Sequence, residues 1–188
     1  MQVIRVSTGV AREALINGRK LLTATGKQPM QGPVGVGVLG LAGDGQADPT
    51  VHGGISKAIY AYPSEHLPFW KTVRSQAQVS LWEEEVPPGV LGENLLLDGL
   101  LEADMYIGDR LILPGCVLAI SEPRYPCFKF NAAMGFKQAT KMMVQSGYSG
   151  CYLAVVEGGT VQAGDAFTVQ AGPRDVSIRE LFRSRARV

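Results

Sequence analysis

The sequence predicts a mainly β fold with a few helices, of the α+β class, arranged as a barrel or a sandwich. The apolar runs are short, and the 23 glycine and 11 proline residues are scattered between them, a pattern typical of many short strands separated by turns. The runs that we predict as strands are 34–38, 58–61, 95–97, 111–113, 117–120, 152–156 and 166–169. A chain of 188 residues can bury a substantial core as one domain.

One turn pattern supports this prediction because it occurs twice. Gly108-Asp109 and Gly164-Asp165 each precede a run of β-forming residues, and a Gly-Asp pair favours a tight turn. We therefore expect each pair to start a strand.

Helices are expected in two internal segments. Residues 64–74 carry Leu67, Trp70 and Val73 near helical spacing, although Pro68 falls in the first turn. Residues 129–146 form the longer candidate, which Gly135 should divide and Gly147 should end.

The end of the sequence predicts a third helical segment. Ser177 and Glu180 have the spacing of a capping box, so a helix should begin at Ile178. Its basic end, 183–187, is expected to be solvated.

Composition and charge exclude several classes of partner. With 18 basic and 17 acidic residues, the net charge of +1 gives no broad field for a nucleic acid or an anionic membrane. No apolar stretch approaches the roughly 18 residues of a membrane span, and the N-terminus does not resemble a signal peptide, so we expect a cytoplasmic protein. Three cysteines without a C-x-x-C pair argue against a disulfide framework and a structural zinc site.

Cys127 is the cysteine with the most unusual surroundings. It follows the predicted strand 117–120 within a segment interrupted by Pro123 and Pro126, so it should lie at the mouth of that strand. Arg124 and Lys129 would favour its thiolate, the form that acts as a nucleophile or a metal ligand. An inert buried cysteine is the competing interpretation, and it is the one we expect for Cys116 and Cys151.

Two glycine-rich segments suggest binding sites. Residues 35–40 match G-x-G-x-x-G, but no helix can start in the turn-rich residues that follow, so close backbone approach explains these glycines better than a dinucleotide. Residues 43–57 could form a nest for an anionic group such as a phosphate, completed by Ser56 and Lys57. An ordinary turn at Asp44-Gly45 is the alternative.

Six motifs in a fixed order identify a family resemblance. They are G-D-G-Q-A-D-P-T-V-H-G-G at 43–54, K-A-I-Y-A-Y-P-S-E-H at 57–66, G-E-N-L at 92–95, I-G-D-R at 107–110, E-P-R-Y-P-C-F-K-F-N at 122–131 and V-Q-A-G-D at 161–165. This series resembles the YiiM-like branch of the MOSC-domain proteins, named after the C-terminal domain of molybdenum cofactor sulfurase. The resemblance covers about residues 1–172.

The resemblance implies a β-barrel-like MOSC domain over 1–172 and a short helical tail over 173–188, which ends within the first helix of the C-terminal region found in full YiiM-like proteins. It also implies a molybdenum-pterin cofactor, or molybdopterin, with Cys127 as its metal ligand and catalytic residue. The other expected cofactor-binding residues are His52, Gly53, Gly54, Lys57, Glu93, Asn94, Arg124 and Asn131.

Members of this branch reduce N-hydroxylated compounds, such as purine base analogues, to amines. The resemblance therefore implies an oxidoreductase whose electrons come from a separate reductase, because the sequence has no flavin, iron–sulfur or nicotinamide motif. One alternative is a cofactor or sulfur carrier without reductase activity. Two others are a hydrolase with Cys127 as nucleophile and His52 as base, and a binding domain for a non-metal ligand. Whether the chain forms a homodimer stays open.

Overall fold

The computed structural model describes residues 1–16, 18–45 and 53–186. The strands are β1 (Gln2–Thr8), β2 (Arg12–Ile16), β3 (Arg19–Thr23), β4 (Gln28–Pro29), β5 (Val34–Gly37), β6 (Gly40–Leu41), β7 (Ile59–Pro63), β8 (Leu95–Asp98), β9 (Arg110–Ile112), β10 (Val117–Pro123), β11 (Cys151–Glu157), β12 (Gly159–Val161) and β13 (Thr168–Gln170). The helices are α1 (Leu67–Gln76), α2 (Phe128–Met134), α3 (Ala139–Ser146) and α4 (Ile178–Arg185), with 3₁₀ turns η1 (Ile55–Lys57) and η2 (Ser64–His66).

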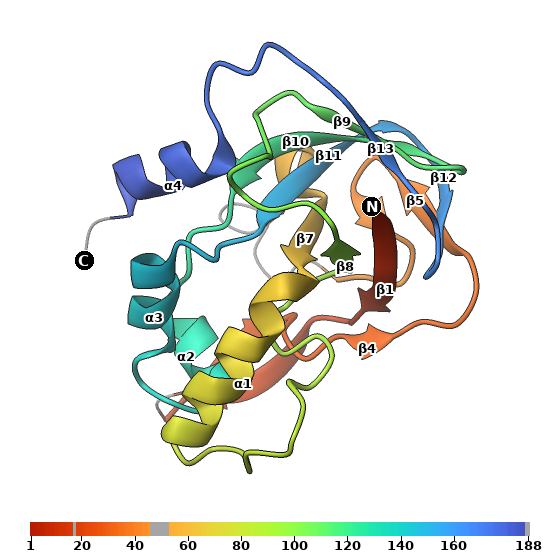
Figure 1. Cartoon of the computed structure of the whole chain (residues 1–188). Coiled ribbons are helices and arrows are strands. Elements are labelled where there is room, and N and C mark those ends of the chain that lie inside the picture. Colours follow the sequence, from red (N-terminus) through yellow and green to blue (C-terminus); the bar gives the residue numbers. More distant parts are fainter. Residues whose placement is uncertain (17, 46–52, 187–188) are drawn as a thin grey trace.

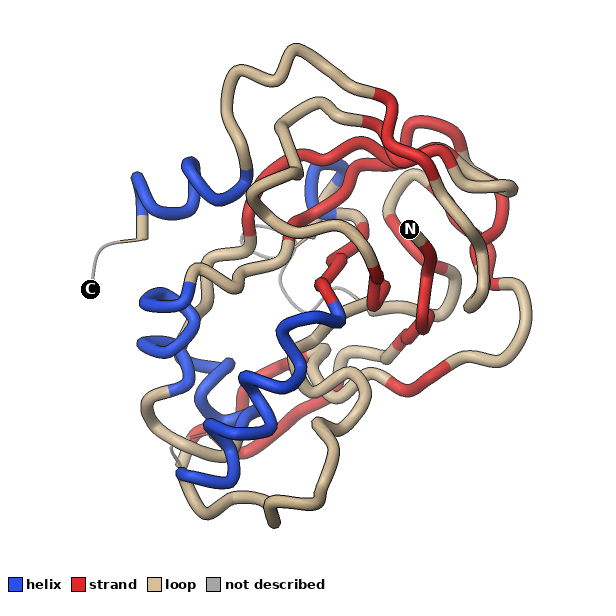
Figure 2. Tube along the Cα trace, in the orientation of Figure 1, coloured by secondary structure: helices blue, strands red, loops and turns tan. Residues whose placement is uncertain are grey.

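Most of the strands belong to one large mixed sheet (Figure 1). Its order is β13-β9-β10-β11-β7-β8-β1-β4; β7 and β8 pair in parallel, whereas the other neighbours pair antiparallel. A smaller sheet has the order β12-β5-β6. The helices α1, α2 and α3 gather on one side of the large sheet (Figure 2). The predicted mainly β α+β class is confirmed.

The central strands are buried on both faces. Along β7, Ile59 and Ala61 belong to one apolar core, whereas Tyr60 and Tyr62 belong to a second core shared with the helices. Successive side chains of a strand point to opposite faces, so β7 separates two cores and has no solvated face. This explains why the sequence shows short continuous apolar runs instead of an alternation with polar residues.

The expected barrel requires a correction, because the described strands form an open sheet. The outer edge of β1 is divided between two short partners: Ser7 and Thr8 pair with β4, whereas Gln2 forms an isolated bridge with Ala166. The N–H of Val3 also donates to the Asp165 carbonyl at 2.9 Å. Neither partner pairs along the whole length of β1. No continuous ladder of strand pairs therefore closes the described strands into a barrel.

The predicted helices are present, although the first of them, expected over 64–74, is a 3₁₀ turn over 64–66 followed by α1, which ends at Gln76. Gly135 and Gly147 end α2 and α3 in the left-handed conformation, with φ of 83° and 77°, which glycine adopts without a steric cost. Pro68 is accommodated in the first turn of α1, where its missing N–H removes no helical hydrogen bond. The capping box at the start of α4 is present, with Ser177 Oγ accepting from Glu180 N at 3.2 Å.

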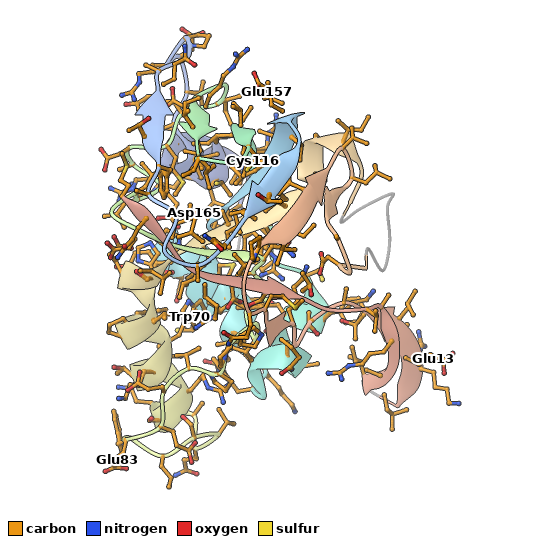
Figure 3. The ribbon with its side chains drawn as sticks, turned by 90° about the vertical axis from the view of Figure 1, so that its right-hand side faces the viewer. Glu13, Trp70, Glu83, Cys116, Glu157 and Asp165 are labelled. Atoms are coloured by element: carbon orange, nitrogen blue, oxygen red, sulfur yellow. The ribbon has the colours of Figure 1, made fainter. Side chains whose placement is uncertain are left out.

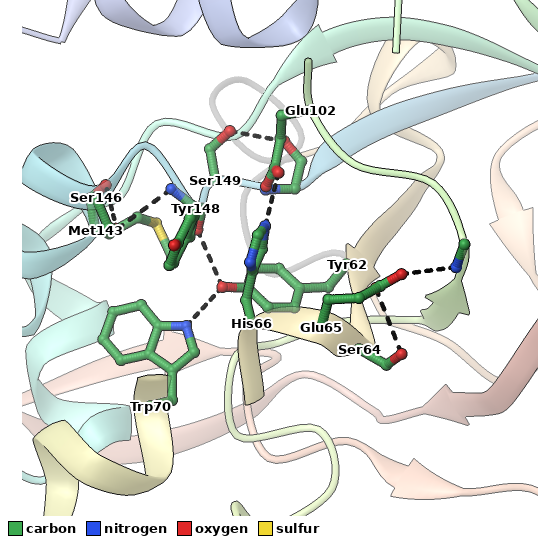
Figure 4. A network of polar contacts seen from close by, with 12 residues as sticks. Tyr62, Ser64, Glu65, His66, Trp70, Glu102, Met143, Ser146, Tyr148 and Ser149 are labelled. Carbon is green, nitrogen blue, oxygen red and sulfur yellow. Dashed lines mark hydrogen bonds and ion pairs between the residues drawn. The ribbon is translucent and has the colours of Figure 1, made fainter. Parts of the chain in front are cut away.

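A buried polar network fixes α1 to the loop before β11 (Figure 4). His66 Nε2 lies 2.7 Å from Glu102 Oε2, and the His66 ring stacks on Tyr148 with 3.7 Å between centroids. Trp70 Nε1 donates to the Tyr62 hydroxyl, which donates in turn to the Tyr148 carbonyl at 3.1 Å. These contacts position the chain that leads from α3 into the sheet.

The β2–β3 hairpin projects from the body of the molecule, with Glu13 far from the large sheet (Figure 3). It was not predicted, because its exposed strands lack the continuous apolar runs of the buried ones. Its register pairs Ile16 with Arg19. The intervening Asn-Gly dipeptide is a strong hairpin signal that could have identified it.

In the described residues, none of the helices is both long and apolar enough to cross a membrane.

Candidate functional site

Cys127 lies where the β10 segment passes into α2. It is the residue before α2, with an extended backbone (φ −114°, ψ 172°), and its side chain is partly exposed. Its carbonyl accepts a hydrogen bond from Thr140 Oγ1 at 3.4 Å, so the start of α3 supports its backbone. Because β10 ends at Pro123, shortly before Cys127, the prediction that Cys127 lies at the mouth of a strand is confirmed.

A pocket next to Cys127 brings together segments that are distant in the sequence. Its cavity volume is about 100 Å³, and the empty space between its walls, open solvent included, is about 700 Å³. Its lining residues are Thr23, Ala24, Thr25, Lys27, Asp44, Gly45, Lys57, Ala58, Tyr60, Gly92, Asn94, Arg124, Cys127, Lys129 and Tyr152.

The charge of this lining is predominantly positive. Lys27, Lys57, Arg124 and Lys129 line the pocket together with one carboxylate, Asp44. Lys57 Nζ also lies 3.7 Å from a carboxylate oxygen of Glu122. Cations gathered around a partly enclosed space favour an anionic ligand.

Arg124 is the most firmly held of these cations. It is 7% exposed; Nη1 donates to the Leu91 carbonyl at 2.6 Å, and the guanidinium carbon lies 4.7 Å from the Tyr60 ring centroid. Burial acts to lower the pKa of Arg124, but the hydroxyls of Tyr60 and Tyr152 and the Cys127 thiol raise it overall. The wall beside Cys127 therefore keeps a fixed positive charge.

Lys27 and Asp44 form a buried ion pair in the same pocket. Their side chains are 8% and 7% exposed, and Nζ lies 2.5 Å from Asp44 Oδ2. Asp44 Oδ1 also accepts a hydrogen bond from Gly9 N at 2.9 Å. Burial lowers the pKa of Lys27, although the Asp44 carboxylate acts in the opposite direction. The pair joins the chain after β3 to the loop after β6.

Two tyrosine hydroxyls contribute neutral polar groups to the lining. Burial raises the pKa of Tyr60 and of Tyr152, although Arg124 acts in the opposite direction on both. Both hydroxyls are therefore protonated at neutral pH, and Tyr60 donates to the Ser149 carbonyl at 2.8 Å.

The structure brings some of the expected site residues into this pocket and leaves others outside its lining. Cys127, Lys57, Asn94 and Arg124 are among the lining residues. The Asn94 side chain holds the wall together, because Oδ1 accepts from Tyr60 N at 3.0 Å and Nδ2 donates to the Ser7 carbonyl at 3.2 Å.

Four other expected residues lie outside the lining. Glu93 is 1% exposed; Oε1 accepts from Gly89 N at 2.8 Å and pairs with Arg5 at 2.9 Å. Asn131 accepts from Thr140 N at 2.8 Å and borders a neighbouring hollow. Gly53 and Gly54 directly precede η1, which ends at the lining residue Lys57. His52 lies outside the described residues.

Sequence reasoning missed several lining residues, notably Lys27, Tyr60 and Tyr152. Lys27 carries no motif of its own, although its partner Asp44 lies in the 43–54 motif, within the segment predicted as either an anion nest or a turn. Of the glycines at 35–40, Gly40 serves close backbone approach as predicted, because a Cβ there would lie 2.2 Å from the Ala58 carbonyl oxygen, whereas Gly35 and Gly37 have room for a Cβ. Gly40 thus allows β6 to pack against the pocket wall at Ala58.

The other two cysteines are core residues, as predicted. Cys116 and Cys151 are 5% and 0% exposed. Burial raises the pKa of Cys116 to about 11 and that of Cys151 still further. A thiol whose pKa is raised in this way keeps its proton at pH 8, and only the thiolate reacts with an alkylating reagent, so neither residue is expected to react in the folded protein.

We therefore expect iodoacetamide at pH 8 to label Cys127 in the folded protein while Cys116 and Cys151 react only after unfolding. Mass spectrometry of the digested protein measures each site. As an internal control, all three cysteines should be labelled in guanidinium chloride. Labelling of Cys151 at the rate of Cys127 in the folded protein would contradict this assignment.

Sequence comparison relates the chain to known proteins. Residues 48–168 match the MOSC domain. Protein YiiM of Escherichia coli (strain K12) is 33% identical over 159 residues, which is 84% of this chain and 68% of YiiM. The uncharacterized protein YflK of Bacillus subtilis (strain 168) is 33% identical over 178 residues, covering 94% of this chain and 77% of YflK. A protein named reductase from Gibberella moniliformis is 30% identical over 172 residues, or 91% of this chain but only 29% of that protein.

Structural comparison gives the same relationship. The crystal structure of YiiM from Geobacillus stearothermophilus superposes with a TM-score of 0.74 at 28% identity, covering 96% of this chain and 81% of that one. YiiM from E. coli superposes with a TM-score of 0.72 at 26% identity, covering 97% of this chain and 76% of that one. The chain therefore belongs to the MOSC-domain family and is a YiiM-like member of it.

Proposed function

We propose that the pocket binds a molybdenum-pterin cofactor through Cys127 and that the protein reduces N-hydroxylated compounds to amines with electrons from a separate protein. The observation that carries this proposal is the position of a partly exposed thiol in a pocket whose lining carries four cationic side chains. Similarity to YiiM and to a protein named reductase supports the oxidoreductase class.

The chemistry of the donor set fits this cofactor. Within the described ranges, no three His, Cys, Asp or Glu side chains converge on a point that could hold a bare metal ion. A metal that is already coordinated by the sulfur atoms of a pterin needs only one further soft ligand from the protein, and a thiolate is such a ligand. The phosphate of the pterin would be matched by the cationic lining.

Each pocket residue then has a defined task. Cys127 is proposed as the metal ligand, and Arg124, fixed by Leu91 and Tyr60, holds its charge beside that thiol. Lys57 and Lys129 are proposed to bind the phosphate. The backbone of Gly53 and Gly54, with His52, would complete the loop around the pterin. Glu93 and Asn131 would support the pocket wall from outside, where they accept hydrogen bonds from the N–H groups of Gly89 and Thr140.

The proposed overall reaction needs a cofactor, two electrons and two protons for each substrate molecule. When bound, the cofactor supplies the two-electron chemistry that cleaves the N–O bond. The substrate R–NH–OH takes up two electrons and two protons and yields R–NH₂ and water. The protein contributes binding, orientation and positive charge around the site.

The proposal is tested by reduction of an N-hydroxylated purine with dithionite as the electron donor. Protein purified from a host that makes the cofactor should form the amine in many turnovers per chain, measured by liquid chromatography. The same protein from a host unable to make the cofactor is the matched control and should form none.

Two outcomes would contradict the reductase proposal. Cofactor-containing protein that forms no amine, but passes its cofactor to a cofactor-free molybdoenzyme, would identify the carrier alternative. Equal amine formation by both preparations would exclude dependence on the cofactor.

A further inference from the structure

An exposed aromatic side chain and a hollow lie directly beside the pocket. Phe128, the residue after Cys127, is 53% exposed. It borders a hollow on α2, whose lining residues are Phe128, Asn131, Ala132, Gly135, Phe136 and Lys137. We refer to these residues together with Lys141 as the α2 surface. Exposed aromatic groups in a hollow are typical anchors of protein interfaces.

The charge of this part of the chain has a single sign. Residues 123–156 contain no Asp or Glu, yet they include Arg124, Lys129, Lys137 and Lys141. In a chain whose net charge is only +1, this segment alone carries four positive charges, although the exposed Glu84 lies near Arg74, which donates to the Met134 carbonyl at the end of α2. Lys137 and Lys141 are exposed, and Lys129 lines the pocket itself.

Hydrogen bonds hold α3, which carries Lys141, against Cys127. Thr140, the residue before Lys141, donates from its N–H to Asn131 Oδ1 at 2.8 Å and from its hydroxyl to the Cys127 carbonyl at 3.4 Å. The start of α3, next to Lys141, and the exposed Phe128 therefore lie at the end of α2 that carries the thiol, whereas Lys137 follows the other end of α2.

We propose that the α2 surface is the docking site of an acidic one-electron carrier protein. This inference rests on the proposed function, because each reduced N–O bond consumes two electrons and the sequence has no motif for a second redox centre. Two carrier molecules would each give one electron and leave oxidised, while two protons from solvent complete the amine and water. Electrons cross protein efficiently only over short distances, so the carrier must dock close to Cys127.

The same charges argue against a second copy of this chain as the occupant. A two-fold dimer would place this surface against itself, so the lysines of one copy would lie opposite the same positively charged surface of the other. Like charges across an interface are unfavourable, whereas an acidic partner would be attracted and oriented by them.

The test uses a plant-type [2Fe–2S] ferredoxin as the acidic carrier, kept reduced by NADPH and ferredoxin–NADP reductase. Cofactor-containing protein should reduce an N-hydroxylated purine with a kcat/KM for ferredoxin that falls steeply as salt rises. The variant Lys137→Glu/Lys141→Glu should lower this kcat/KM at least tenfold at low salt. Its dithionite-driven rate should be unchanged, because neither lysine lines the pocket.

The matched control is Arg110→Glu/Arg183→Glu, which makes the same charge change at exposed positions on β9 and α4. It should retain the wild-type kcat/KM for ferredoxin within about twofold. Equal losses in the two double variants, or no saturable and salt-sensitive rate with ferredoxin, would overturn the proposal.

Calorimetric titration with oxidised ferredoxin separates failure of docking from failure of the proposed reaction. Wild-type protein should bind ferredoxin at low salt, and the Lys137→Glu/Lys141→Glu variant should bind at least tenfold more weakly. Absence of dithionite-driven turnover would refute the proposed reaction while the titration still tests docking. Equally tight binding of a double-stranded oligonucleotide would mark a general polyanion surface and overturn the carrier assignment.

Discussion

Replacing Asp44 by Asn is expected to lower the free energy of unfolding by about 3–5 kcal/mol, because it leaves the charge of Lys27 buried without a partner. The two side chains are 8% and 7% exposed and their charged atoms lie 2.5 Å apart. Chemical denaturation at neutral pH measures the effect. The variant Glu13→Gln is the matched control: Glu13 and Lys20 are 69% and 79% exposed and 3.8 Å apart, so its loss should stay below about 1 kcal/mol.

The pH dependence of this loss follows from the pKa of Lys27. Burial lowers that pKa below its usual value of 10.5, and Asp44 opposes the decrease, so Asp44→Asn should lower it further. The charged ammonium then destabilises the fold below its folded-state pKa, and the cost disappears as the pH rises toward 10.5. The destabilisation should therefore shrink with rising pH, and Lys27→Met/Asp44→Leu should recover most of it at neutral pH. A loss that grows with pH would contradict the assignment.

Replacing Cys127 by Ser is expected to reduce the molybdenum content at least tenfold. A hydroxyl keeps its proton at neutral pH and is a harder ligand than a thiolate, so it cannot take the place proposed for Cys127. Because Cys127 is partly exposed, the free energy of unfolding should change by no more than about 0.5 kcal/mol. Elemental analysis and denaturation of the same preparation measure both quantities.

The control for this variant is Cys116→Ala. Cys116 is 5% exposed and belongs to the core, so its loss should cost stability but leave the molybdenum content unchanged. Equal metal in Cys127→Ser and wild-type protein would remove Cys127 from the site.

The fold was largely predictable because its signals are local. Short apolar runs identify the buried strands, and Gly108-Asp109 and Gly164-Asp165 precede β9 and β13. Gly135 and Gly147 set helix ends through their backbone geometry, and Ser177 sets one through its side-chain cap. The open sheet was not predictable, because it depends on how two distant segments share the edge of β1. The β2–β3 hairpin was not predicted because its exposed strands form no continuous apolar run, although an Asn-Gly dipeptide separates them in the sequence.

The residues of the candidate site were also predictable only in part. Cys127 and Arg124 were found because proline, charge and motif coincide within a few residues. Lys27, Tyr60 and Tyr152 reach the pocket from separate segments, so their role depends on the tertiary arrangement. Glu93 and Asn94 are neighbours in one motif, yet only Asn94 lines the pocket, because the Glu93 carboxylate is held by Arg5 and the Gly89 N–H.

The most direct test of the central claim is the molybdenum and pterin content of the wild-type protein. The protein should be purified from a host that makes the cofactor and that also produces a known molybdoenzyme as a loading control. The account predicts close to one molybdenum and one pterin per chain. A fully loaded control enzyme beside protein that contains neither metal nor pterin would contradict it.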